Sequence, residues 1–284
     1  MRAAAKLTAE DTDEMDNTHT VVRAAYAARV EDDGNCWGTT GTEKDVSLEL
    51  GYTEEDIKIA GDGNLGEGCG NPRSFANLKP GEVVVDLGSG AGFDAMLAGV
   101  SVTSKGQVVG VDMTPEMISK ARKNVKSKGK SMSHVSFRLG EIEYLPIAND
   151  FADVVMSNCV INLSPDKQQV YREAFRVLKP GGRLAIADVV AMREIPKHLR
   201  TAEALACWVS GAAKPDDVSA ILKSVGFVQV SITQKPESKS IIKKWMPGSG
   251  AEEYVCSANI IAVKPGTSKR TVEEDDDLPL CLRM

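Results

Sequence analysis

The sequence lacks the features that mark membrane, secreted and zinc-binding proteins. It has no run of about 18 apolar residues, so no membrane-spanning helix is expected. Residues 1–17 are polar and acidic, which is atypical of a secretory signal and of a transit peptide. The six cysteines include no Cys-x-x-Cys pair, which argues against a structural zinc site. These absences predict a cytoplasmic protein with mostly free thiols.

Positive charge is also scarce. The formal net charge is −6, whereas a protein that binds a nucleic-acid backbone needs a basic stripe. The one basic run, residues 120–130, is predicted to be the solvated face of a helix. Nucleic acid is therefore not an expected partner. With 284 residues, the chain can bury a core without disulfides or a metal.

A β-branched run followed by glycines marks the centre of the chain. Val83–Leu87 is typical of a buried parallel strand. Gly88, Gly90 and Gly92 then let the backbone turn sharply and approach a ligand closely. This Gly-x-Gly-x-Gly spacing differs from the dinucleotide fingerprint and is by itself a weak signal. A tight turn that binds nothing is the alternative.

Strand-like and helix-like segments alternate strictly after residue 82. Strands are predicted at residues 83–87, 106–112, 134–139, 151–157, 183–188, 228–232 and 254–263, with helices at 93–100, 114–130 and 167–178. Such alternation predicts an α/β fold with a doubly wound, mainly parallel sheet, followed here by a smaller C-terminal α+β unit.

Distinctive residues stand where four of these strands end, and ligands of open α/β sheets bind beyond such ends. They are Asp86 with the glycine loop, Asp112-Met113, Gly140-Glu141-Ile142 and Ser157-Asn158-Cys159. A carboxylate at Asp112 can accept hydrogen bonds from both hydroxyls of a ribose. Glu141 and Ile142 can flank an adenine, and Asp86 suits a cation better than a phosphate. Ribose, adenine and positive charge occur together in S-adenosylmethionine.

Longer stretches carry a resemblance to a known family. They are residues 64–72 (NLGEGCGNP), 86–94 (DLGSGAGFD), 111–117 (VDMTPEM), 140–143 (GEIE), 157–167 (SNCVINLSPDK) and 245–254 (WMPGSGAEEY). On these stretches the chain resembles arsenite methyltransferases of the algal and bacterial type, within the class I S-adenosylmethionine-dependent methyltransferases. Many methyltransferases share the glycine loop, whereas GCGNP and SNCVINLS are more specific.

The resemblance implies that trivalent arsenic, as arsenite, its thiol conjugates or methylarsenite, accepts methyl groups from S-adenosylmethionine, an arsenic detoxification. The predicted cofactor-binding residues are Asp86, Gly88, Ser89, Gly90, Asp112, Met113, Met117, Glu141, Ile142 and Asn158. Thiolates would bind the soft, three-coordinate arsenic. Its lone pair then attacks the methyl group without a general base, so that positioning supplies about 7–11 kcal/mol of the catalysis.

Three cysteines are predicted to be catalytic arsenic ligands. Cys159 follows the strand end beside Asn158, and Cys69 lies in a glycine-dense loop. Cys207 stands one position earlier than in the family pattern, and Trp208 occupies the usual slot. On a helix one residue is about 100° of rotation, whereas a loop can absorb the shift. Cys207 is retained as the predicted third ligand.

The other cysteines have weaker assignments. Cys36 matches an N-terminal cysteine that the family links to redox steps, although Trp37 stands where many members have a second cysteine. It is predicted to be an auxiliary redox thiol, with a bystander as the alternative. Cys256 is expected in the core and Cys281 in an acidic tail. A thiol reductant, glutathione or thioredoxin, is the implied second cofactor or partner.

The predicted units are a disordered N-terminus (1–17), a cap with the S-adenosylmethionine-binding domain (18–190), a substrate and C-terminal domain (191–265) and a disordered tail (266–284). Two other functions stay open. A methyltransferase of a small organic acceptor would need a general base, which the sequence does not clearly offer. A non-enzymatic protein that sequesters arsenic would need no cofactor pocket.

Overall fold

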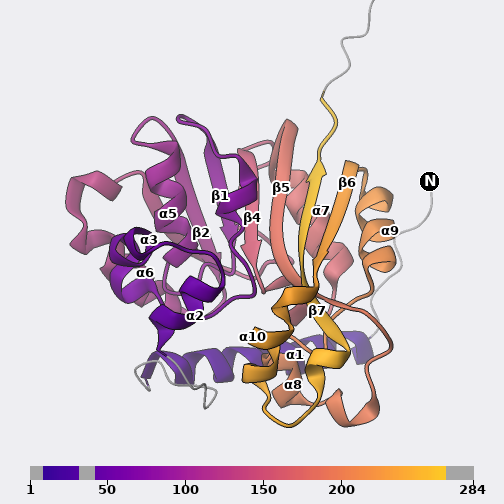
Figure 1. Ribbon diagram of the computed structural model, residues 1–284. Coiled ribbons are helices and arrows are strands. Elements are labelled where there is room, and N and C mark those ends of the chain that lie inside the picture. Colours follow the sequence, from indigo (N-terminus) through magenta and orange to yellow (C-terminus); the bar gives the residue numbers. More distant parts are fainter. Residues whose placement is uncertain (1–8, 32–41, 267–284) are drawn as a thin grey trace, which may run out of the picture.

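A single seven-stranded sheet runs through the centre of the molecule, in the strand order β3-β2-β1-β4-β5-β7-β6 (Figure 1). The computed structural model describes residues 9–31 and 42–266. Its strands are β1 Val83–Leu87, β2 Gln107–Asp112, β3 Val135–Leu139, β4 Ala152–Asn158, β5 Leu178–Ala191, β6 Val228–Lys235 and β7 Val255–Val263. Neighbouring strands from β1 to β5 pair in parallel, and β7 pairs antiparallel with β5 and β6. The predicted fold class is confirmed.

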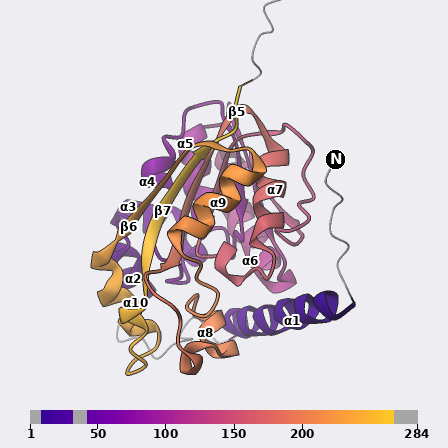
Figure 2. The same cartoon turned by 90° about the vertical axis from the view of Figure 1, so that its right-hand side faces the viewer.

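Helices cover both faces of this sheet. They are α1 Ala9–Glu31, α2 Glu43–Glu49, α3 Glu54–Ala60, α4 Arg73–Ala76, α5 Phe93–Val102, α6 Pro115–Ser127, α7 Lys167–Val177, α8 Ala202–Ala206, α9 Pro215–Val225 and α10 Lys239–Trp245. Val85 and Leu87 of β1 pack toward α7 and α9, which lie together on one side (Figure 2). Val84 packs toward α4, α5 and α6 on the other. Alternate side chains of a strand point to opposite faces, so both faces of β1 are buried.

Two predicted boundaries differ from the structure. Helix α1 begins at Ala9, so residues 9–17 of the N-terminus predicted to be disordered are helical, and this stretch contains good helix formers such as Ala9 and Glu14. β6 and β7 continue the main sheet beyond β5, and the boundary predicted after residue 190 falls inside β5. The division into domains therefore stays a prediction. Residues 1–8 and 267–284 lie outside the described residues.

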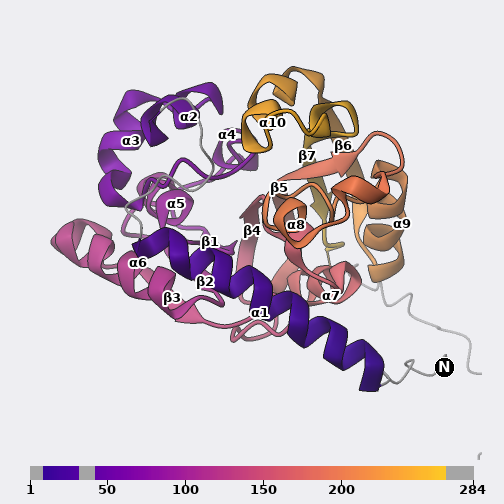
Figure 3. The same ribbon diagram turned by 90° about the horizontal axis from the view of Figure 1, so that it is seen from below.

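Several helices gather at the carboxyl ends of the parallel strands. Seen from below, α1 runs diagonally across this edge, and above it in the view α2 and α3 lie at the left and α8 and α10 at the right (Figure 3). Thr42 and Thr53 start α2 and α3 with capping boxes, each paired with an aspartate three residues later. None of the described helices is long and apolar enough to span a membrane. These helices surround the pocket described next.

Candidate active site

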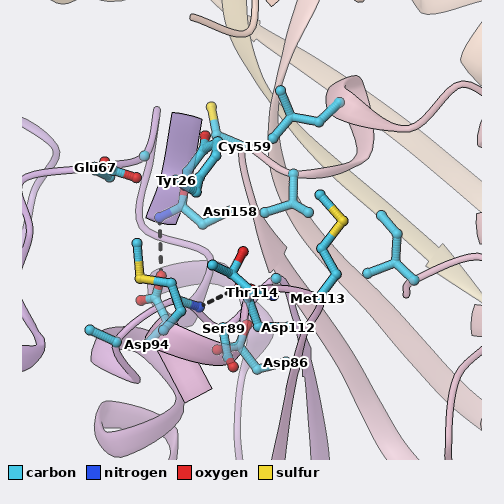
Figure 4. Close-up of a pocket in the computed structure, with 18 of the residues that line it drawn as sticks. Tyr26, Glu67, Asp86, Ser89, Asp94, Asp112, Met113, Thr114, Asn158 and Cys159 are labelled. Atoms are coloured by element: carbon cyan, nitrogen blue, oxygen red, sulfur yellow. Dashed lines mark hydrogen bonds between the residues drawn. The ribbon is translucent and has the colours of Figure 1, made fainter. Parts of the chain in front are cut away.

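A pocket opens at the carboxyl edge of β1, β2 and β4, beneath α1 (Figure 4). Three aspartates line it: Asp86 at the end of β1, Asp94 in the first turn of α5 and Asp112 at the end of β2. No lysine or arginine is among the described residues that line it. An acidic, largely enclosed pocket of this kind suits a cationic ligand.

The glycine loop is held in place by β2. The backbone N–H groups of Gly88 and Ser89 both donate to the carbonyl oxygen of Val111, at 2.7 and 3.0 Å. A Cβ on Gly88 would lie 2.3 Å from a methyl group of Val160, whereas one on Gly90 would meet nothing within 4 Å. The turn is therefore packed at Gly88 and open at Gly90, where a ligand can approach the backbone.

The Asp112 carboxylate is fixed on both oxygens. Oδ2 accepts from the Gly90 N–H at 2.9 Å and Oδ1 from the Thr114 N–H at 2.8 Å. The Ser89 hydroxyl close by is buried and has no hydrogen-bond partner within the described structure. A carboxylate and an unpartnered hydroxyl at this place can bind the hydroxyl groups of a ribose, as the sequence predicted for Asp112.

Burial raises the pKa of all three carboxyl groups. For Asp86 the neighbouring Asp94 and Asp112 raise the pKa further, since like charges oppose ionisation. For Asp94, hydrogen bonds from Tyr52 and Asn158 oppose the effect of burial, and for Asp112 the N–H groups of Thr114 and Gly90 do so. A bound cation would favour ionisation at each of these carboxyl groups.

Replacing Asp86 with asparagine is expected to stabilise the ligand-free protein while weakening cation binding. Because the pKa of Asp86 is raised in the folded protein, the unfolded chain releases this proton at a lower pH than the folded protein does. As the pH rises above about 4, ionisation therefore favours the unfolded state, and Asp86 lowers the free energy of unfolding. The melting temperature of Asp86→Asn should exceed that of wild type by about 3 °C at pH 8 and by less at pH 5. Calorimetry without ligand measures this. An Asp62→Asn control at an exposed position should change neither value, and a pH-independent gain would contradict the explanation.

Two cysteines from distant segments meet beside the pocket, and Cys159 lines it whereas Cys69 does not. Cys69, in the loop before α4, and Cys159, directly after β4, are joined by a disulfide with their Cα atoms 5.8 Å apart. A carboxylate oxygen of Asp188 lies within 4.8 Å of both sulfur atoms. Burial raises the pKa of this carboxyl to about 7. The structure thus brings together two of the three predicted arsenic ligands, 90 residues apart in sequence.

Cys207 belongs to the same cluster of buried residues as Cys69 and Cys159. It follows α8, is fully buried and does not line the pocket, whereas Trp208 does. Burial raises the pKa of the Cys207 thiol to about 12, against the opposing effect of Arg29. Trp208 has a φ of 61°, an unusual backbone conformation for a bulky residue, and packs edge-on against Trp245. The one-residue shift seen in the sequence therefore places Trp208, and not Cys207, in the wall of the pocket. The ligand role of Cys207 stays a prediction.

Most of the predicted cofactor-binding residues surround this pocket. Those that line it are Asp86, Gly88, Ser89, Gly90, Asp112, Met113, Met117, Ile142 and Asn158. Glu141 does not line it, and its carboxylate pairs with Arg23 of α1 at 3.1 Å. Cys36, the predicted redox thiol, lies outside the described residues. The structure brings these residues together, and their individual roles stay predictions.

Helix α1 covers the pocket through polar contacts. The imidazole Nε2 of His19 lies 3.2 Å from a carboxylate oxygen of Glu143. Farther along, the guanidinium of Arg29 lies 3.0 Å from Glu67 and donates to the carbonyl oxygen of Ala206 at 3.3 Å. Arg29 thus joins α1 to the loop that carries Cys69 and to the end of α8. Its guanidinium also stacks 4.0 Å from the ring centroid of Tyr26.

Replacing Arg29 with methionine is expected to lower the free energy of unfolding by about 2 kcal/mol, because charged hydrogen bonds contribute about 1.5–3 kcal/mol each. The carboxylate of Glu67, whose pKa burial raises, would lose its cation. Urea denaturation measures the loss. The double variant with Glu67→Gln should recover part of it, and Arg172→Met on the exposed face of α7 is the control. Equal stability of Arg29→Met and wild type would contradict the assignment.

Sequence reasoning missed several polar residues of this region. Tyr26, Glu67 and Asp94 line the pocket, and Tyr52 donates a hydrogen bond to Asp94. Asp94 belongs to the motif DLGSGAGFD, so its place near the glycine loop was a usable signal. Tyr26 and Tyr52 lie outside every motif, and only the folded chain brings them to the site.

Comparisons with known proteins agree with this geometry. A family model described as a methyltransferase domain matches residues 78–246. An arsenite methyltransferase of Halobacterium salinarum is 45% identical over 265 residues, which cover 88% of this chain and 67% of that protein. The human arsenite methyltransferase is 41% identical over 154 residues, which cover 51% of this chain and 40% of that protein. The chain thus spans two thirds of the first relative's length and less than half of the second's.

A solved structure shows the same fold with a related sequence. It is an arsenic(III) S-adenosylmethionine methyltransferase from Chlamydomonas reinhardtii, with a TM-score of 0.58 and 31% identity, covering 78% of this chain and 73% of that chain. A putative sarcosine dimethylglycine methyltransferase from Galdieria sulphuraria has a TM-score of 0.61 at 16% identity and supports the fold alone. The chain belongs to the arsenite methyltransferase family of S-adenosylmethionine-dependent methyltransferases.

Proposed function

We propose that this protein transfers methyl groups from S-adenosylmethionine to trivalent arsenic held by the thiolates of Cys69 and Cys159. The observation that carries the proposal is the meeting of these two cysteines, with Cα atoms 5.8 Å apart, beside an acidic pocket. Trivalent arsenic is soft and three-coordinate, and a pair of adjacent thiolates suits it.

The residues of the pocket fit the methyl donor. Asp112 and the unpartnered Ser89 hydroxyl can take the ribose, and the open face of Gly90 admits a ligand against the backbone. Asp86 can face the positive charge of the cofactor's amino-acid end. When bound, S-adenosylmethionine supplies an electrophilic methyl group on a sulfonium. The protein's share is to bind, orient and shield both reactants from water.

The third arsenic ligand can come from the protein or from a small thiol. Cys207 is fully buried and does not line the pocket, so to act as the third ligand it would need a rearrangement of the turn after α8. A glutathione thiolate needs no such change and would enter with the arsenic as a thiol conjugate. We therefore propose two protein thiolates and one exchangeable ligand, with Cys207 as the alternative third.

A thiol reductant is part of the proposed reaction. The disulfide between Cys69 and Cys159 must open before either sulfur can bind arsenic. Two glutathione molecules or one thioredoxin would reduce it, giving two protein thiols and either glutathione disulfide or oxidised thioredoxin. Such reductants are abundant in the cytoplasm, where we propose that the protein acts.

The test is to incubate the purified, reduced protein with arsenite, S-adenosylmethionine and glutathione, and to separate the arsenic species by chromatography. Methylated arsenicals are expected, and none should form when the cofactor is omitted. Normal cofactor binding without any methylarsenical would reject arsenic as the acceptor.

A further inference from the structure

The side chain of Asn158 makes hydrogen bonds to the backbone of both Cys69 and Gly70. The amide oxygen of Asn158 accepts from the Cys69 N–H at 3.1 Å, and its Nδ2 donates to the carbonyl oxygen of Gly70 at 2.8 Å. A Cβ on Gly68 would lie 2.7 Å from the same Nδ2, so the loop packs tightly against this amide. Asn158 directly precedes Cys159, and it therefore sets where one cysteine stands relative to the other.

Asp94 decides which way that amide points. Its Oδ2 accepts from Asn158 Nδ2 at 3.0 Å, and the hydrogen bonds from Asn158 and Tyr52 favour the ionised, acceptor-only form of Asp94 against the burial that raises its pKa. The NH₂ group of Asn158 must then face Asp94, which leaves its oxygen for the Cys69 N–H. A flipped amide would place oxygen against oxygen at Asp94 and two donors against each other at Cys69. Asp94, which lies outside the loop that carries Cys69, therefore sets the orientation of the Asn158 amide.

Tyr52 completes the network. Its hydroxyl donates to Asp94 Oδ1 at 2.7 Å and lies 3.1 Å from Asn158 Nδ2. The hydroxyl has one proton, and the shorter distance assigns it to Asp94 and not to the carbonyl oxygen of Gly70, which lies 3.2 Å away. The ring is 4% exposed and packs edge-on against Phe93 at 4.7 Å. Tyr52 does not itself line the pocket.

We propose that Tyr52 is a positioning residue for methyl transfer. Through Asp94 and Asn158 it fixes the backbone of Cys69, and so the place of an arsenic atom held between Cys69 and Cys159. The inference rests on the proposed function for its activity readout. Because a misplacement of about 1 Å can cost about 100-fold in rate, a hydroxyl that never touches the reactants can control the reaction.

Tyr52→Phe removes this hydroxyl and keeps the ring. The kcat for arsenite methylation should fall by about 10- to 100-fold, the usual effect of losing a group that orients a ligand residue. The Kd for S-adenosylmethionine should stay within about threefold, since Tyr52 does not line the pocket. Tyr254→Phe, the same change at a partly buried tyrosine beside Arg193, is the matched control and should alter neither value.

A second readout separates this proposal from the proposed function. Phenylarsine oxide bridges two adjacent thiols, so its capture by the reduced protein reports on the Cys69 and Cys159 pair without any methyl transfer. Capture should slow about tenfold in Tyr52→Phe and not in Tyr254→Phe. If the wild type fails to methylate arsenite, the proposed function is rejected and this capture rate alone decides the role of Tyr52. The inference would be overturned by an unchanged rate of capture in Tyr52→Phe, or by a kcat within twofold of that of wild type. Parallel losses of kcat and of affinity for S-adenosylmethionine would also overturn it.

Discussion

Replacing Cys159 with serine is expected to lower the kcat for arsenite methylation by at least about 1,000-fold, which corresponds to about 4 kcal/mol of transition-state stabilisation. Serine keeps the size and position of the side chain but is a hard oxygen donor with a high pKa, so it does not replace a thiolate on arsenic. Cys159 lines the pocket and pairs with Cys69, so its loss leaves one thiolate beside the pocket. Arsenic speciation after timed incubation measures the effect.

Cofactor affinity should be nearly unchanged in that variant, because the residues proposed to face the cofactor are aspartates and backbone groups. The Kd for S-adenosylmethionine should stay within about threefold of wild type by calorimetry. Cys256→Ser is the matched control. Cys256 is fully buried in β7, where its thiol lies 3.7 Å from Gln234, and a hydroxyl can keep that contact. Substantial activity in Cys159→Ser would instead favour an organic acceptor for which the cysteines are incidental.

Replacing Asp112 with alanine should raise the Kd for S-adenosylmethionine about 100-fold, because two hydrogen bonds from a charged group contribute about 3 kcal/mol. We expect this carboxylate to have two tasks. It accepts from the Gly90 and Thr114 N–H groups at 2.9 and 2.8 Å, which holds the glycine loop against β2, and its remaining lone pairs can take the ribose hydroxyls. Both are lost in alanine.

Isothermal calorimetry measures the Asp112→Ala effect, and Asp112→Asn refines it. Asparagine keeps one acceptor oxygen, so we expect an intermediate Kd. Asp216→Ala, an exposed aspartate in the first turn of α9, controls for the loss of a negative charge from the protein. A Kd for Asp112→Ala within threefold of wild type would show that the ribose binds elsewhere in the pocket.

The sequence alone determined the parts of this protein that rest on local patterns. Val83–Leu87 forms β1 as its β-branched run predicted, and Thr114 with Pro115 starts α6 as expected. Because the carboxyl ends of parallel strands share one edge of a sheet, the meeting of Asp86, Asp112 and Asn158 follows from the order of the segments. The family followed from motifs that are contiguous in the chain.

Only the tertiary structure decided contacts between segments without a common pattern. It showed that β6 and β7 extend the main sheet, since pairing with β5 is a long-range choice. It also joined Cys69 to Cys159 across 90 residues and placed Trp208, not Cys207, in the pocket wall. Tyr52 reached Asp94 in the same way. Local sequence sets backbone preference and periodicity, whereas the direction of a side chain in a loop is set by what packs around it, and that is known only when the chain has folded.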